Sequence, residues 1–146
     1  MYSLYIWGMS KLRRLSISLD EKLVEAFDRQ IAAQNYPTRS KAIGDLIRES
    51  LTRSEWVKGR RVAGAILMVY DHHRHNLLHH LTAAQHKYHH LVIATQHFHL
   101  DHDNCLEIVA VQGKPGEIDR LYQSLRSVKG LKYCSLAAAT TGSQLA

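Results

Sequence analysis

Residues 91–111 read LVIATQHFHLDHDNCLEIVAV and predict a β-hairpin. The segments 91–100 and 105–111 are rich in apolar residues of the kind that favours strands. The polar cluster between them, Asp-His-Asp-Asn at 101–104, is typical of a tight turn. Because such a turn brings the second strand back beside the first, we expect the two segments to lie side by side in one sheet.

Patterns on both sides of the hairpin predict a ferredoxin-like domain. Upstream, residues 62–70 are predicted to form a strand and residues 76–88 a helix with an apolar inner face. Downstream, a turn at 113–116 precedes a predicted helix over 117–128 and a last strand over 131–137. The order β-α-β-β-α-β is the split βαβ arrangement, so the predicted fold class is α+β.

The N-terminal part predicts a strand followed by two helices. Residues 13–19, RRLSISL, alternate so that Leu15, Ile17 and Leu19 share one face of a strand. Asp20 is a helix N-cap, and apolar residues then recur at helical spacing to about Ala33. Pro37 breaks this helix, and Thr38 or Ser40 can cap the next one.

A strand with one apolar and one polar face has no sheet partner nearby in this sequence. Pairing with the same strand of a second chain would solve this problem and yield an intertwined dimer. The polar face of the resulting ribbon would carry Arg14, Ser16 and Ser18 from both chains. Since a two-stranded ribbon fits the major groove of DNA, these side chains are candidates for reading base edges.

The length of the chain suits one domain of ordinary size or two small ones. The chain has 146 residues, and residues 1–61 hold 12 Lys and Arg against 7 Asp and Glu. The remainder is near neutral, with 7 against 6, so the charge of the first part indicates either a nucleic-acid contact or an ordinary solvated basic surface. We expect a flexible extension over 1–10, a ribbon-helix-helix domain over 11–53, a linker over 54–61, a ferredoxin-like domain over 62–138 and a disordered tail over 139–146.

Cysteine and histidine usage points to a metal-binding protein in a reducing compartment. The two cysteines make no disulfide framework, which favours free thiols in the cytoplasm. No apolar run is long enough to span a membrane. All 11 histidines lie between His72 and His102. The reason for such clustering could be metal binding, buffering or an accident of ancestry, and the clustering alone does not choose among them.

The sharpest candidate for a metal site lies in the hairpin. His97 and His99 are two residues apart in a strand, so both imidazoles project from the same face. Cys105 begins the next strand, where its thiolate can lie close to both. Two imidazoles and one thiolate suit zinc, copper, nickel or cobalt and argue against calcium or magnesium.

The hairpin leaves a fourth ligand to be found. Candidates lie at the helix end, Gln85-His86-Lys87-Tyr88-His89-His90, in this chain or another. Cys134 is the other thiol, and its apolar strand favours a buried, unreactive side chain. The remaining histidines, at 72, 73, 75, 79 and 80, leave weak secondary metal sites open.

These residues resemble the nickel-responsive transcriptional regulators, which join a ribbon-helix-helix domain to an ACT-like metal-binding domain. The resemblance covers residues 11–137 and is most specific at residues 95–108, where both histidines, the cysteine and their spacing are intact. It implies a square-planar nickel site of His97, His99, Cys105 and His86 of a neighbouring subunit, one Ni²⁺ per subunit. It also implies a homotetramer, built as a dimer of dimers, with Gln85 and Glu107 orienting the ligand histidines.

For the N-terminal domain, the resemblance implies an operator-binding repressor of nickel uptake. Arg14, Ser16 and Ser18 match base-reading positions on a palindromic double-stranded DNA operator. Arg39 and Ser40 open the second helix, whose N-terminus can hold a backbone phosphate. One departure concerns Lys41, since relatives commonly hold an acidic residue there that helps bind an alkali ion together with the residue matched by Asp45. Either a Lys41–Asp45 pair replaces the ion, or the site is lost.

Two other functions compete with this interpretation. A metal-dependent enzyme would need an open coordination position and a nearby acid or base, and the sequence indicates no substrate pocket. A metal storage or chaperone protein would use the histidine cluster but would leave the Arg14-x-Ser16-x-Ser18 pattern unexplained. We therefore expect a DNA-binding regulator without catalytic residues.

Overall fold

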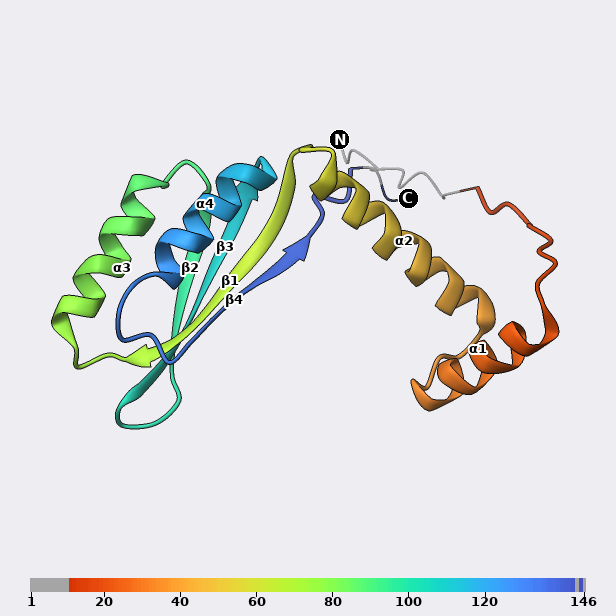
Figure 1. Cartoon of the computed structure of the whole chain (residues 1–146), viewed down its shortest axis with the longest axis horizontal. Helices are drawn as coiled ribbons and strands as arrows, with labels where there is room; N and C mark the ends of the chain where they lie inside the picture. The colour runs from red at the N-terminus through yellow and green to blue at the C-terminus, as the bar shows by residue number, and fades with distance from the viewer. Residues whose placement is uncertain (1–10, 144, 146) are drawn as a thin grey trace, which may run out of the picture. The chain divides into compact units, whose positions relative to one another are not determined.

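The computed structural model describes residues 11–143 and 145, so the extension expected over 1–10 lies outside the described residues. The chain divides into two compact units, one ending at Arg48 and the other covering Glu49–Leu145. The described residues form four helices and four strands (Figure 1). None of these helices has the length and apolar character needed to cross a lipid bilayer.

The first unit contains helix α1, Glu21–Ala33, and most of helix α2, Arg39–Val57. The Asp20 carboxylate caps α1 by accepting the backbone N–H groups of Lys22 and Leu23 at 3.0 and 3.4 Å. The Thr38 hydroxyl caps α2 by accepting the Lys41 N–H at 3.1 Å. Both helices therefore begin where the sequence predicts, with Thr38 as the cap of the second.

The strand expected over 13–19 does not form within one chain. Residues 11–20 have no regular secondary structure, and Leu15, Ile17 and Leu19 are 75%, 58% and 55% exposed. A β-strand needs a hydrogen-bonded neighbour, and no other strand of the described residues pairs with this segment. Its alternation alone therefore does not make a strand.

The second unit is a four-stranded antiparallel sheet in the order β2-β3-β1-β4. Its strands are β1, Val62–Asp71; β2, Val92–His99; β3, Asn104–Gly113; and β4, Tyr133–Ala139. Helices α3, His75–Lys87, and α4, Pro115–Arg126, lie on the same side of the sheet (Figure 1). The predicted βαββαβ order is confirmed.

The sheet has one covered and one open face. In β1 and β3, alternate residues are fully buried against the helices, among them Ile66, Met68 and Val109. The residues between them face away from the helices and stay partly exposed. This open face has one charged residue, Asp71 at the end of β1, and consists otherwise of uncharged residues: Ala63, Ala65, Leu67, Val69, Ala94, Gln96, Phe98, Asn104, Leu106, Ile108, Ala110, Gln112, Tyr133, Ser135, Ala137 and Ala139.

The two segments expected to be irregular are more ordered than the sequence suggests. Helix α2 continues to Val57 and so takes in the first half of the predicted 54–61 linker. The Trp56 indole donates to the Ala139 carbonyl at 2.8 Å, and the Thr140 hydroxyl donates to buried Glu55 at 2.7 Å. These bonds fasten the end of α2 to the end of β4 and to Thr140, which follows it.

Candidate metal centre and nucleic-acid interface

The predicted ligands of the hairpin lie at the end of the sheet where the turn joins β2 to β3. His99 lies opposite Cys105 and His97 opposite Glu107 in the β2–β3 pairing. Tyr70 lies opposite Cys105 on the other side of β3. Directly paired residues share a face of a sheet, so all five side chains are on the side that carries α3 and α4.

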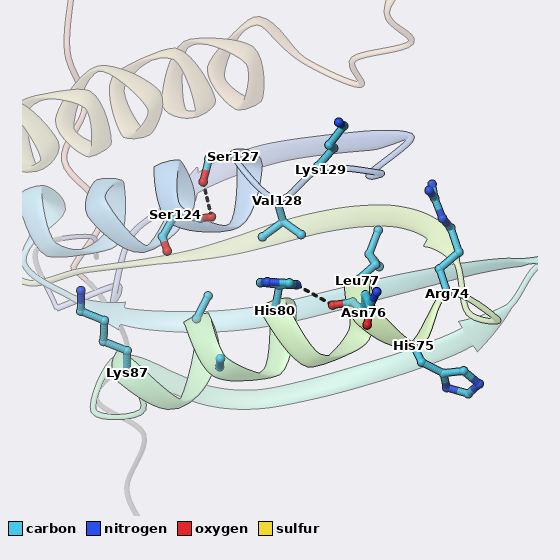
Figure 2. Close-up of a pocket in the computed structure, with 12 residues that line it drawn as sticks. Arg74, His75, Asn76, Leu77, His80, Lys87, Ser124, Ser127, Val128 and Lys129 are labelled. Carbon is cyan, nitrogen blue, oxygen red and sulfur yellow. Dashed lines mark hydrogen bonds between the residues drawn. The ribbon is translucent and has the colours of Figure 1, made fainter.

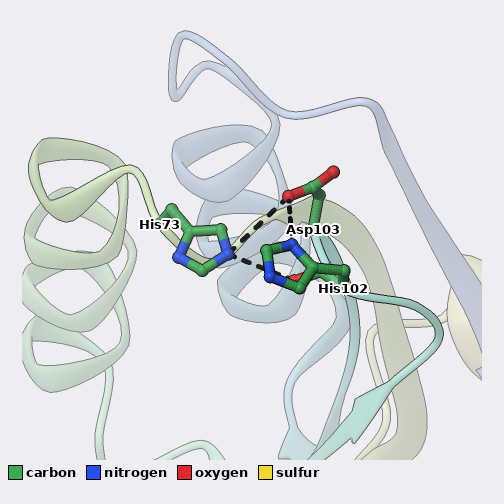
Figure 3. A group of neighbouring side chains, drawn as sticks. All are labelled: His73, His102 and Asp103. Atoms are coloured by element: carbon green, nitrogen blue, oxygen red, sulfur yellow. Dashed lines mark hydrogen bonds and ion pairs between the residues drawn. The ribbon is translucent and has the colours of Figure 1, made fainter.

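One imidazole and the thiol are already close together. Cys105 is buried, and its Sγ lies 3.9 Å from Nδ1 of exposed His97. The His99 ring instead packs edge-on against His72, with ring centroids 4.9 Å apart. In the described residues, the group of three side chains whose ligand atoms all lie within 4.8 Å of one another is His73, His102 and Asp103 (Figure 3). Closing the hairpin trio around one ion therefore requires a rotation of an exposed histidine ring.

Buried Glu107 organises the surroundings of these ligands. Its carboxylate accepts a hydrogen bond from Tyr70 and another from the Gln85 side chain at 2.6 Å. The Gln85 amide oxygen in turn accepts from Thr95 at 3.1 Å. Glu107 Oε2 also lies 3.7 Å from His97 Nδ1. Glu107 and Gln85 thus form one hydrogen-bonded network beside His97.

Tyr70 is the member of this network that sequence reasoning missed. Burial and the hydrogen bond to the Glu107 carboxylate raise the pKa of Tyr70. Its hydroxyl therefore stays protonated and donates to Glu107, and its oxygen lies 3.4 Å from His97 Nδ1. Its position two strands away from His97 in the sheet gave no signal in the linear sequence.

His86 is exposed near the end of α3 and does not join the hairpin ligands in its own chain. Its ring lies 6.0 Å from that of His89, centroid to centroid. The donor set of the hairpin, with one thiol and two imidazoles, still fits a borderline divalent metal such as nickel. A fourth donor at this site would have to come from outside the described group of His97, His99 and Cys105.

Cys134 is partly buried, whereas the sequence predicts a buried side chain. It lies in β4, where burial raises the pKa of its thiol. It faces Met68 across the β1–β4 pairing, away from the hairpin strands. Both cysteines are free thiols.

The predicted DNA-reading side chains are open to solvent. Arg14, Ser16 and Ser18 are all exposed, as is Ser40 in the first turn of α2. Arg39 differs, because its guanidinium donates through Nε to the Asp28 carboxylate at 2.7 Å and through a second nitrogen to the other oxygen. This pair holds the pKa of Asp28 below its usual value and ties α2 to α1.

Lys41 and Asp45 meet in the structure. The Lys41 ammonium lies 2.7 Å from both oxygens of the Asp45 carboxylate, one helical turn away in α2. Arg48 approaches the same carboxylate at 3.1 Å. The hydrogen bond from Lys41 is the main reason that the pKa of Asp45 is lowered. A Lys41–Asp45 ion pair is therefore present within α2.

An open groove of about 990 Å³ runs between α3 and α4 (Figure 2). Arg74, Lys87 and Lys129 give it a positive charge, and the hydroxyls of Ser124 and Ser127 lie on its α4 side. None of the predicted metal ligands lines it. It is a surface feature that the sequence pattern did not indicate.

Comparison with known proteins gives two matched domains. Residues 13–54 match the family described as "Ribbon-helix-helix protein, copG family". Residues 63–139 match the "NikR C terminal nickel binding domain". Both matches agree with the division predicted from the sequence into a ribbon-helix-helix domain and a metal-binding domain.

Relatives match over nearly the full chain. A protein of Chlorobaculum tepidum is 50% identical over 90% of this chain and 98% of its own length. Proteins of Chlorobium limicola and Syntrophus aciditrophicus are each 48% identical over 92% of this chain, and over 100% and 98% of their own lengths. All three are named "Putative nickel-responsive regulator". This chain therefore belongs to the family of nickel-responsive, ribbon-helix-helix transcriptional regulators, which are DNA-binding proteins rather than enzymes.

Proposed function

We propose that this protein is a homotetrameric repressor that binds a palindromic operator when each subunit holds one Ni²⁺, and that the operator controls nickel-uptake genes. The observation that carries the proposal is the hairpin, in which the β2–β3 register places His97, His99 and Cys105 on one face of the sheet. His86 of a neighbouring copy completes the site. A DNA regulator with free thiols acts in the cytoplasm.

The ligand chemistry supports nickel at this position. Nickel accepts borderline imidazole and thiolate donors together, and it is one of the two common metals that favour square-planar geometry. Cys105 Sγ and His97 Nδ1 lie 3.9 Å apart before any metal draws them together. Glu107 holds Gln85 from α3 next to the His97 imidazole and keeps the network ordered. The metal joins the subunits, and these residues determine its position.

The exposed apolar residues support assembly from several copies. In the first unit the buried apolar side chains are Ile31 and Ala42, while Leu23, Leu46 and Ile47 are each at least half exposed. Such a small unit needs a partner to bury an adequate core. Pairing of two 13–19 segments builds the ribbon, and contacts between sheet units join two such dimers.

The coupling between metal and DNA follows from this assembly. A ligand shifts a conformational equilibrium only when it binds one conformer better than the other. Since a site completed by His86 of another copy exists only in the assembled arrangement, nickel favours the conformer in which both ribbons reach their half-sites. Lys58, Arg60, Arg61 and Arg74 then contribute salt-dependent contacts to phosphate.

A DNA titration with and without nickel tests the proposal. Fluorescence anisotropy of promoter DNA at fixed ionic strength should show a rise in affinity of about tenfold or more when one Ni²⁺ per chain is added, which is a coupling energy of at least about 1.4 kcal/mol. Equal affinity in both conditions contradicts it.

Two cysteine variants make the test specific. Cys105→Ala removes the proposed thiolate ligand and should abolish the response to nickel. Cys134→Ala removes the other free thiol, which lies in β4 away from the hairpin, and should keep the response. A Cys105→Ala variant that still responds at low nickel concentration would show that the ligand assignment is wrong.

A further inference from the structure

The end of helix α2 is held by residues at the end of β4 (Figure 1). The Trp56 indole donates to the Ala139 carbonyl at 2.8 Å, and the Thr140 hydroxyl donates to the Glu55 carboxylate at 2.7 Å. These two bonds are called the α2–β4 contact below. All four residues belong to the unit Glu49–Leu145, which contains the sheet. We propose that Glu55, Trp56 and Thr140 are positioning residues that transmit nickel binding from this unit to the DNA-binding unit.

The three positioning residues lie outside the two segments that match known families. The matched segments are 13–54 and 63–139. Glu55 and Trp56 lie between them, and Thr140 follows the second. The contact therefore depends on residues that neither matched segment contains.

Helix α2 continues without a break from one unit into the other. Its residues 39–48 belong to the first unit, and its residues 49–57 belong to the second. A hydrogen-bonded helix acts as a semi-rigid spacer, whereas an irregular polar segment is flexible. Whatever fixes the last turn of α2 therefore also constrains the part of the helix that belongs to the DNA-binding unit.

Backbone hydrogen bonds hold the same turn of α2 next to β1. Gly59 has a positive φ of 68°, and its N–H donates to the Trp56 carbonyl at 3.4 Å. The Arg60 N–H donates to the Glu55 carbonyl at 3.1 Å. This pair of bonds is the Schellman arrangement, in which a left-handed glycine ends a helix. Since β1 begins at Val62, the turn is fixed to β1 by its backbone and to the end of β4 by its side chains.

The side chains of the α2–β4 contact are shielded from solvent. Glu55 is 6% exposed, and in the described part of the chain Thr140 is the side chain that hydrogen-bonds to its carboxylate. Trp56 is partly buried and packs against the core of the sheet unit. Because a buried carboxylate without its partner is unfavourable, loss of the Thr140 hydroxyl should loosen the last turn of α2.

The sheet connects the contact to the metal hairpin. Ala139 pairs with Ala63 at the start of β1. The other end of β1 carries Tyr70, which lies opposite the proposed ligand Cys105 of β3. Antiparallel strands are joined by ladders of backbone hydrogen bonds, so the strands of this sheet move together. In the proposed tetramer nickel fixes neighbouring sheets relative to one another, and the contact passes this arrangement to α2, so the inference rests on the proposed function.

Hydrogen exchange and DNA titration of the full-length protein test the inference together. Thr140→Val keeps the shape of the side chain and removes the donor to Glu55, and Trp56→Phe removes the donor to Ala139. In the double variant, amides of residues 52–58 should exchange at least about fivefold faster than in the wild type. The nickel-induced gain in DNA affinity should fall by about threefold or more. The nickel titration itself should match the wild type, because no proposed ligand is changed.

Two further variants make the test specific. Thr141→Val removes the neighbouring hydroxyl, which pairs with Ser143 and not with α2, and should match the wild type in both measurements. Thr140→Ser keeps the hydroxyl that donates to Glu55 and should keep both the slow exchange and the full nickel response.

The two measurements separate this inference from the proposed function. Faster exchange at the end of α2 together with a reduced nickel response supports the inference. Unchanged exchange in the double variant overturns it, and so does faster exchange with a full nickel response. In both of those cases the wild type still responds to nickel. A wild type whose DNA affinity is the same with and without nickel contradicts the proposed function, and the inference fails with it.

Discussion

At the scale of single residues, Glu107 is the group on which the hairpin site depends most. It is 2% exposed and accepts hydrogen bonds from Tyr70 and Gln85 while lying 3.7 Å from His97 Nδ1. A buried carboxylate is favourable only when such partners surround it. The same network borders the His97 imidazole, so we propose that Glu107 is a positioning residue for this metal ligand.

Replacing Glu107 by Gln should weaken nickel binding by about 10- to 100-fold. The amide has the shape of the carboxylate but cannot accept on both sides, so one of its two donors loses its partner, and this costs about 1–3 kcal/mol of stability. The pKa of Tyr70 should also fall, because part of its upward shift comes from Glu107. Nickel affinity by calorimetry and tyrosine absorbance against pH measure the two effects. Asp119→Asn, at an exposed acidic position of α4, is the control and should change neither.

Lys41 leads to a prediction that is specific to this protein. Its ammonium contacts both oxygens of Asp45, where the resemblance to relatives implies an alkali ion. DNA affinity should therefore be the same in potassium and in a bulky organic cation of equal ionic strength. Lys41→Glu restores the acidic pair and should make binding depend on potassium. Anisotropy titrations in the two salts measure this, and a potassium requirement in the wild type would contradict the substitution.

At the scale of elements, the unpaired segment 13–19 is the part of the fold that one chain leaves unfinished. Leu15, Ile17 and Leu19 alternate with polar residues, yet all three are more than half exposed. We propose that the segment becomes a strand only beside its own copy. The apolar residues would then face the helices, and the polar ones would face DNA.

Adjacent substitutions on this segment should separate dimerisation from DNA binding. Ile17→Glu puts a charge on the apolar face of the ribbon in both chains. Losing two buried Ile side chains is unfavourable by about 3–6 kcal/mol, which raises the dimer dissociation constant by about 10²–10⁴-fold. Ser16→Glu puts the same charge on the polar face and should keep the dimer while losing DNA affinity. Analytical ultracentrifugation and anisotropy distinguish the two. Equal oligomeric states for both variants would refute the proposed pairing.

The elements also show what the sequence could and could not predict. Helix α1 was predictable to its ends, because Asp20 caps it and the apolar spacing stops at Ala33. Helix α2 was not, since Trp56 and Glu55 form hydrogen bonds with residues 139 and 140, and such long-range contacts leave no local pattern. Because these contacts are not visible in the sequence, the polar, basic segment 54–61 was predicted to be a linker.

The candidate site, too, was predictable from the sequence only in part. The spacing of His97, His99 and Cys105 was enough to place them on one face of the sheet, because two-residue periodicity and a tight turn fix the strand geometry. It did not predict that the His99 ring packs against His72. The cluster of His73, His102 and Asp103 depends on the register between β1 and β3, where Asp71 lies opposite Asn104. Register over such a distance in sequence follows from the packing of the whole sheet.

At the scale of the whole molecule, the open face of the sheet is the surface that most needs a partner. It spans all four strands, and Phe98 and Tyr133 on it are 45% and 56% exposed. Large apolar patches on one side of an antiparallel sheet commonly mark protein interfaces. We propose that the same face of a second subunit covers it in the tetramer.

A charge on this face should reduce the assembly from four chains to two. Ile108→Lys places a lysine in the middle of β3, and burying an unpaired charge between two sheets is strongly unfavourable. The ribbon dimer should persist, because its contacts lie in the other unit. Gln123→Lys makes the same change of charge on exposed α4 and should leave the tetramer intact. Light scattering at micromolar concentration measures the masses, and a tetrameric Ile108→Lys variant would exclude this face as the interface.

The open face has a single charged residue, Asp71 at its end, so contacts between two such faces would depend on salt differently from contacts to DNA. Contacts to phosphate weaken steeply as counterions are added, by about 10³–10⁵ between about 50 and 200 mM salt for 6–10 contacts. An interface of alanine, leucine, isoleucine and aromatic side chains has no ion pairs for salt to screen, and sulfate strengthens it. In the proposed tetramer, a rise in ionic strength would therefore weaken operator binding and leave the contacts between the sheet faces in place.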